Sequence, residues 1–152
     1  MGHNDAYAIG ARRVQQVMTQ QVSQELAAVD VSPARARSIV RRMLAVWDAD
    51  DEVRLTELLT SELVTNAVRH AATEIMLRVA VDARTVRVEV TDTGKTMPVL
   101  TQTPDVGGYG LRIVDQLAAR WGVDPIPNDG KTVWFEVDLK GHEAGTRVTT
   151  RP

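Results

Sequence analysis

The feature that most constrains the fold is one helical stripe over residues 55 to 70, in which leucines give way to polar groups. The stripe advances by one, three or four residues at each step, which is the spacing of side chains on one face of an α-helix. Its members are Leu55, Leu58, Leu59, Glu62, Leu63, Asn66, Ala67 and His70. Burying a carboxylate, an amide or an imidazole without a partner costs roughly 1–3 kcal/mol per group. We therefore expect the second half of this helix to face a polar pocket rather than core.

Size, charge and composition narrow the classes of protein that fit such a helix. The 152 residues suit one domain with a sizeable core. A formal net charge of −2 argues against a nucleic-acid binder that relies on overall charge. Cysteine is absent, and no apolar run approaches the roughly 18 residues of a transmembrane helix. Because the N-terminus also lacks the apolar core of a signal peptide, we expect a cytoplasmic protein.

Apolar periodicity and turn residues predict one folded domain over residues 21–140. A flexible N-terminal arm (residues 1–20) and a flexible C-terminal tail (residues 141–152) are expected to flank it. The expected elements are a strand or a helix at 22–29, helices at 32–47 and about 50–70, strands at 75–81 and 85–91, a helix at 109–120, and strands at 122–126 and 132–139. This order predicts an α+β fold, a two-layer sandwich in which helices cover one face of a mixed, mostly antiparallel sheet.

Glu62 and Asn66 place a carboxylate and an amide one helical turn apart on the same face. An amide oxygen suits Mg²⁺, which prefers oxygen ligands and keeps several waters and substrate phosphates. A carboxylate beside it can orient water or accept a proton from an attacking hydroxyl. The spacing alone is a weak signal, because a Glu and an Asn four residues apart occur by chance in many helices.

Two glycine-containing motifs follow. Asp92-Thr93-Gly94 ends a strand, where the carboxylate can accept a hydrogen bond from an exocyclic amine such as that of adenine, although the tripeptide is also common as a plain turn. Residues 92–108 have no periodicity and are longer than most connections, which is typical of a lid or of a disordered segment. Residues 107–111 (GGYGL) then open a helix, and their backbone N–H groups form a candidate anion site.

In this order, and with Gly130-Lys131-Thr132 entering the last strand, the motifs resemble the GHKL (Bergerat) ATP-binding fold of DNA gyrase, MutL and the histidine kinases. Within that group, the chain is most similar to the bacterial anti-sigma factor kinases of the SpoIIAB and RsbW type, in particular to free-standing actinobacterial members. The similarity covers about residues 20 to 140. It is carried by the stretches SELVTNAVRHA, GGYGLRIVDQLAARWGV and GKTVWFEV.

The resemblance implies ATP and Mg²⁺ as cofactors and gives each matching position a role. Asn66 would bind Mg²⁺, and Glu62 would be the catalytic residue, acting as a base or orienting water. Asp92 would accept the adenine amine. The implied nucleotide-binding residues are Asn66, Arg69, Asp92, Gly94, Gly108, Tyr109, Gly110, Leu111 and Thr132.

Within that set, Gly94 would line the adenine ring and Thr132 would support the same end of the nucleotide. The backbone at 108–111 would hold the phosphates. Arg69 is either a phosphate ligand or a solvated side chain, and His70 is either a structural residue at the helix end or a base. One position departs from the family, because Thr96 stands where a second glycine is usual. A Cβ there would crowd the nucleotide or change the hinge of the lid, but we expect ATP binding to be retained.

The resemblance implies an ATP-dependent protein serine/threonine kinase that phosphorylates a STAS-like anti-anti-sigma partner and regulates a sigma factor. It also implies a homodimer, with no direct binding to nucleic acid or to a membrane. The alternative is a nucleotide-binding regulatory module that has no productive kinase activity and acts through partner binding. A detached histidine kinase domain fits less well, because none of His3, His70 and His142 lies in a predicted dimerising helical hairpin.

Overall fold

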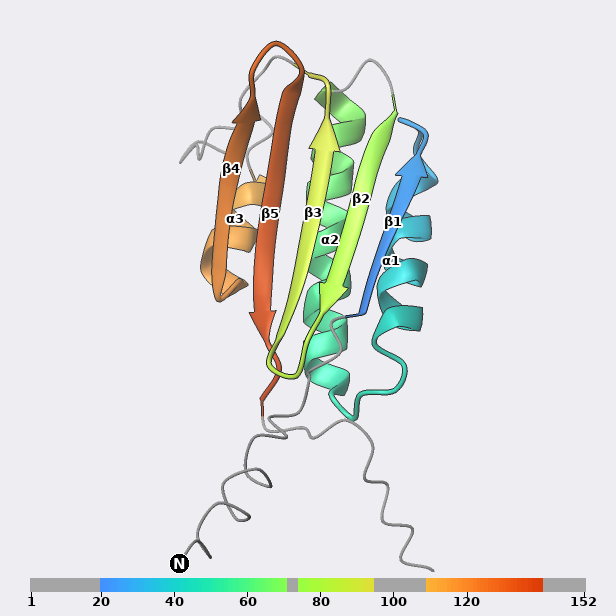
Figure 1. Cartoon of the computed structure of the whole chain (residues 1–152), viewed down its shortest axis with the longest axis vertical. Helices are drawn as coiled ribbons and strands as arrows, with labels where there is room; N and C mark the ends of the chain where they lie inside the picture. Colours follow the sequence, from blue (N-terminus) through green and yellow to red (C-terminus); the bar gives the residue numbers. More distant parts are fainter. Residues whose placement is uncertain (1–19, 71–73, 95–108, 141–152) are drawn as a thin grey trace, which may run out of the picture.

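The computed structural model describes residues 20–70, 74–94 and 109–140. In this part of the chain, five strands form one sheet in the spatial order β1-β2-β3-β5-β4, and three helices cover one face of it (Figure 1). The strands are β1 (Gln20–Leu26), β2 (Ile75–Val81), β3 (Thr85–Asp92), β4 (Arg120–Ile126) and β5 (Gly130–Asp138). The helices are α1 (Ser32–Met43), α2 (Asp50–His70) and α3 (Tyr109–Leu117). The predicted α+β two-layer sandwich is confirmed.

Every pairing between the described strands is antiparallel, so the sheet is more regular than the mixed sheet that the sequence suggested. Short turns at residues 82–84 and 127–129 join β2 to β3 and β4 to β5, and only antiparallel neighbours can be joined so closely. The segment for which strand and helix were both open forms β1, which pairs with β2 at one edge of the sheet.

The core lies between the sheet and the helices. Alternate residues of β3 and β5 face this layer, because successive side chains of a strand point to opposite faces. The buried set from these strands is Val86, Val88, Val90, Val133, Phe135 and Val137. From α2, Leu59, Leu63, Val64 and Ala67 pack into the same cluster. Phe135 is fully buried and is the largest side chain in it.

The buried stripe of α2 differs from the stripe predicted from leucine spacing. Leu58 is 42% exposed, whereas Thr56 and Thr60 are fully buried. Each threonine hydroxyl donates to a backbone carbonyl one turn earlier, Thr56 to Glu52 at 2.6 Å and Thr60 to Thr56 at 2.7 Å. A threonine whose hydroxyl is satisfied within its own helix can pack as an apolar residue does. The core-facing side of α2 is therefore rotated toward these threonines.

Two helices end earlier than their sequences suggested. The helix predicted to reach Trp47 ends at Met43, and the backbone then turns as the N–H of Trp47 donates to the carbonyl of Leu44. The helix predicted to reach Arg120 ends at Leu117, because the N–H of Ala119 already donates to Glu136 on β5. After α3, pairing with β5 thus begins at residues whose spacing alone would continue the helix.

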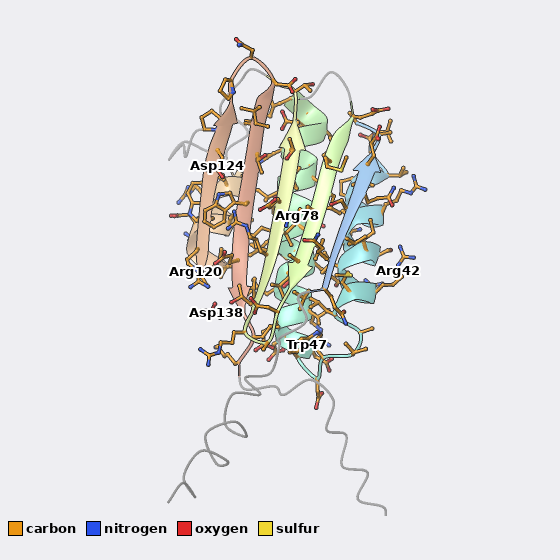
Figure 2. All side chains as sticks on the ribbon, in the orientation of Figure 1. Arg42, Trp47, Arg78, Arg120, Asp124 and Asp138 are labelled. Carbon is orange, nitrogen blue, oxygen red and sulfur yellow. The ribbon has the colours of Figure 1, made fainter. Side chains whose placement is uncertain are left out.

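Charged side chains occupy the outer face of the sheet, which we define as the face without helices (Figure 2). Glu89 accepts from Arg78 at 3.1 Å and from Arg87 at 2.7 Å, and Arg87 also donates to Glu136 at 2.9 Å. Arg120 continues the chain of ion pairs to Glu136 and Asp138. The Arg87 guanidinium lies 4.0 Å from the centre of the Trp134 ring.

Hydrogen bonds from arginines lower the pKa values of two glutamates on the outer face, Glu89 and Glu136. Burial alone would raise the pKa of Glu136, but hydrogen bonds from Arg120 and Arg87 outweigh it and hold the pKa below its usual range. The pKa of Glu89 is lowered in the same way by Arg87 and Arg78, against the effect of its burial.

The described helices include none that is long and apolar enough to cross a membrane. The arm predicted at residues 1–20 and the tail predicted at 141–152 fall outside the described residues, except for Gln20, which begins β1. Their predicted flexibility therefore stays a prediction.

The lowered pKa values predict a loss of stability in acid. A carboxyl whose pKa is depressed on folding stabilises the native state above its unfolded pKa of about 4.3, and this stabilisation is lost as the pH falls through the folded value. We expect Glu136→Gln to flatten the dependence of the unfolding free energy on pH below about pH 5. The loss at neutral pH should stay under about 1 kcal/mol, because partly exposed ion pairs contribute little.

Urea unfolding followed by circular dichroism between pH 3 and pH 7 measures this dependence. Asp124→Asn, an exposed change on the neighbouring strand β4, is the control and should leave the profile unchanged. Parallel profiles for Glu136→Gln and wild type would contradict the prediction.

Candidate functional site

Three elements that carry predicted site residues meet at one end of the sandwich. Figure 1 shows α2 and β3 ending, and β5 beginning, at this end. The pairing of β3 with β5 sets Asp92 opposite Lys131. The carbonyl oxygen of His70, at the end of α2, lies 2.7 Å from the position that a Cβ on Gly94 would take. The end of α2 therefore contacts the backbone that follows β3.

Asp92 and Lys131 form a buried ion pair at this end. Each residue is 3% exposed, and Lys131 Nζ donates to Asp92 Oδ1 at 2.9 Å. The same oxygen accepts the backbone N–H of Gly94 at 2.8 Å, and Nζ also reaches the Gly94 carbonyl at 3.3 Å. We call these three contacts the Asp92 clasp. Asp92 Oδ2 makes no hydrogen bond to any described residue, and a carboxylate oxygen can only accept one.

The residue of β5 that faces Asp92 is Lys131, whereas the predicted support of the nucleotide by Thr132 stays a prediction. Thr132 points to the outer face, where its hydroxyl lies 2.7 Å from that of Thr91. Lys131 shares the helix-covered face with Val133 and Phe135 because side chains alternate along a strand. That alternation was visible in GKTVWFEV and places Lys131 on the buried face, but its pairing with Asp92 depends on the register between β3 and β5.

Two glycines allow the backbone to come this close. Gly130 has φ +98°, and a Cβ there would lie 1.9 Å from the carbonyl oxygen of Asp92. A Cβ on Gly94 would meet both the His70 carbonyl and, at 2.9 Å, Asp92 Oδ1. Gly94 was predicted to line an adenine ring. The contacts of the protein with itself already require glycine at this position.

Glu62 and Asn66 lie on α2 ahead of this end and are both half-buried. They are one turn apart, which separates them by about 6 Å along the helix axis. Within the described part of the chain, neither side chain has a hydrogen bond or an ion pair. Arg69 and His70, in the last turn, are exposed. The polar half of α2 is therefore at the boundary of the core rather than inside it.

The predicted phosphate-binding backbone is described only in part. Tyr109 and Gly110 are the first residues of α3, and Leu111 follows with its side chain 2% exposed in the core. The buried Leu111 side chain leaves only its backbone for contact with a ligand. The N-terminus of a helix favours anions, because its first N–H groups have no partner within the helix. Gly108 and Thr96 lie outside the described residues.

These groups fit an adenine nucleotide with Mg²⁺. Asp92 offers a carboxylate oxygen to an amine, next to backbone at Gly94 where a Cβ would not fit. Glu62 and Asn66 offer side-chain oxygens that have no partner among the described residues. The start of α3, which packs against α2, offers N–H groups to phosphates.

Comparisons with known proteins show the family and the fold of the chain. The family described as the histidine kinase-like ATPase domain matches residues 26–137. The fold is similar to a crystal structure of the RsbU and RsbW domains of Rv1364c from Mycobacterium tuberculosis, with a TM-score of 0.63 and 21% sequence identity. That match covers 86% of this chain and 35% of the other, so this chain spans about a third of its length. No curated protein matches the chain.

The geometry at Gly130 gives a prediction for its replacement. Gly130→Ala should lower the unfolding free energy by more than about 1 kcal/mol, because the residue has a positive φ and a Cβ would collide with the backbone of Asp92. Urea unfolding measures this loss. Asp129→Ala, an exposed change in the same turn, should stay within about 0.5 kcal/mol of wild type. Equal stability of the two variants would contradict the prediction.

Proposed function

Because the chain belongs to the histidine kinase-like ATPase domain family, we propose that it is an ATP-dependent protein serine/threonine kinase of the anti-sigma factor class. Its substrate would be a Ser or Thr hydroxyl on a STAS-like anti-anti-sigma protein. The observation that carries the proposal is the buried carboxylate of Asp92, held beside Gly94 at the end of the helix that bears Glu62 and Asn66.

Each residue has a defined task in this proposal. Asp92 Oδ2 accepts the adenine amine, and the amide oxygen of Asn66 binds Mg²⁺. The backbone from Gly108 to Leu111 donates to the phosphates. Arg69, which is exposed in the last turn of α2, would assist there. Bound Mg-ATP supplies a γ-phosphoryl group whose negative charge is largely neutralised by the metal.

Glu62 is the proposed base. Its carboxylate accepts the proton of the partner's hydroxyl while that oxygen forms a bond to the γ-phosphorus. The bond from the γ-phosphorus to the oxygen bridging it to the β-phosphate breaks, and ADP leaves. Transfer of this kind depends mainly on positioning and charge neutralisation, so a half-buried carboxylate close to Asn66 is sufficient.

The partners are proposed on the same basis. The similar solved structure is named for an RsbW domain, which supports a role in regulating a sigma factor. We propose a cytoplasmic protein that binds a STAS-domain partner and a sigma factor, forms a homodimer, and has no direct contact with nucleic acid or membrane.

One observation favours a second function. Lys131 already occupies one oxygen of Asp92, and Thr96 replaces the glycine that the resemblance leads us to expect. A nucleotide-binding regulatory module without productive transfer would need Asp92 and Asn66 but no base at Glu62.

Glu62→Gln separates these two functions. With a STAS-domain partner and labelled ATP, we expect transfer to fall by 100-fold or more, since general base catalysis contributes roughly 10²–10⁴-fold. Nucleotide binding should persist, because the amide keeps the size and polarity of the side chain. Glu57→Gln, on the same helix, is the control and should leave transfer unchanged. Undiminished transfer by Glu62→Gln would rule out Glu62 as the base.

A titration with Mg-ATP tests the nucleotide site itself. Asn66→Ala and Asp92→Asn should each weaken binding by about 10-fold or more, because a lost contact to a charged or buried polar group is worth roughly 1.5–3 kcal/mol. Isothermal calorimetry on folded protein measures both effects. No heat with any adenine nucleotide would overturn the proposed function.

A further inference from the structure

The buried Asp92–Lys131 ion pair has a desolvation cost that the stability of the core does not explain. Lys131 follows the same alternation as Val133, Phe135 and Val137, all of them buried. An apolar side chain at position 131 would extend that row. Buried ion pairs cost several kcal/mol of desolvation per ion and are often no more stable than apolar replacements. The core therefore does not need this lysine.

The contacts of Lys131 show what the pair does. Nζ contacts Asp92 Oδ1 and the carbonyl of Gly94, while the N–H of Gly94 donates to that same Oδ1. The clasp therefore fixes both polar backbone groups of Gly94 and one oxygen of the carboxylate. Two donors saturate Oδ1, and the turn is held against the end of α2. Only Oδ2 is left without a partner among the described residues.

We propose that Lys131 is a positioning residue that makes the site selective for a base with an exocyclic amine; this role rests on the proposed function, in which Asp92 contacts the base. The clasp orients the carboxylate before ligand binds, so no rotamer freedom is lost at that step. An oxygen acceptor in a fixed place binds an amine and repels a carbonyl oxygen. Adenine has an amine at this edge, and hypoxanthine has a carbonyl there.

The test compares ATP with inosine triphosphate (ITP), in which a carbonyl replaces the exocyclic amine of adenine. Sites built to bond one polar group discriminate strongly against an analogue that lacks it. Wild type should bind ATP at least about 10-fold more tightly than ITP. In Lys131→Met the carboxylate loses its fixed orientation, so the ratio should fall below about 3-fold. Lys140→Met, an exposed change in the same chain, is the matched control and should keep the wild-type ratio.

A second measurement needs no nucleotide. The unfolding free energies of Lys131→Met, Asp92→Asn and the double variant form a double-mutant cycle. Each single change leaves a buried charge without its partner, so the double variant should be less destabilised than the sum of the two. Where Lys131→Met alone does not fold, restored folding of the double variant supports the clasp. A double variant that stays unfolded while Asp92→Asn folds overturns it.

The outcomes distinguish a failure of the positioning role of Lys131 from a failure of the proposed function. A lysine with a purely structural role would lower stability in Lys131→Met and leave the ATP to ITP ratio as in wild type, which would overturn the positioning role and leave the proposed function intact. Absence of binding of either nucleotide to wild type would overturn the proposed function, and base selection by Lys131 with it.

Discussion

The antiparallel register between β3 and β5 is the constraint on which the rest of the structure depends. It pairs Val88 with Phe135 in the core and Asp92 with Lys131 at the end of the sheet. Because side chains alternate between faces, a shift of one residue would move Phe135 to the outer face and separate the ion pair. The arrangement that fills the core is thus the same one that builds the candidate site. Gly130 protects this register, since only glycine fits against the backbone of Asp92.

The two faces of the sheet use charge in different ways. On the outer face, arginines and glutamates form partly exposed ion pairs that solvent screens, so each contributes little to stability. On the helix-covered face, Asp92 and Lys131 are removed from water, where an unpaired charge would be costly. A charged pair tolerated at such a place is more naturally explained by ligand recognition than by stability. The site therefore begins where the apolar rows of β3 and β5 end.

Local patterns in the sequence were sufficient to propose several residues of the candidate site. Asp92 and Gly94 were identified because a carboxylate and a glycine directly follow a strand with alternating valines. Glu62 and Asn66 were identified from their spacing of four on a helix. The leucine count, however, placed Leu58 in the core and overlooked Thr56 and Thr60, which lie in it. A hydroxyl that bonds to its own helix is invisible to a count of apolar residues.

The amino-acid sequence by itself determined the fold class and the order of the elements, because periodicity and turn residues act over a few positions of the chain. Its resemblance to a family gave the residues that we propose bind a nucleotide. The tertiary structure decided that α3 ends at Leu117, that Gln20–Leu26 is an edge strand, and that Lys131 rather than Thr132 meets Asp92. These outcomes depend on contacts between residues far apart in sequence, such as Asp92 with Lys131 and Gly94 with the end of α2. Local propensity has no information about such contacts, and the free energy of burying and pairing distant groups settles them.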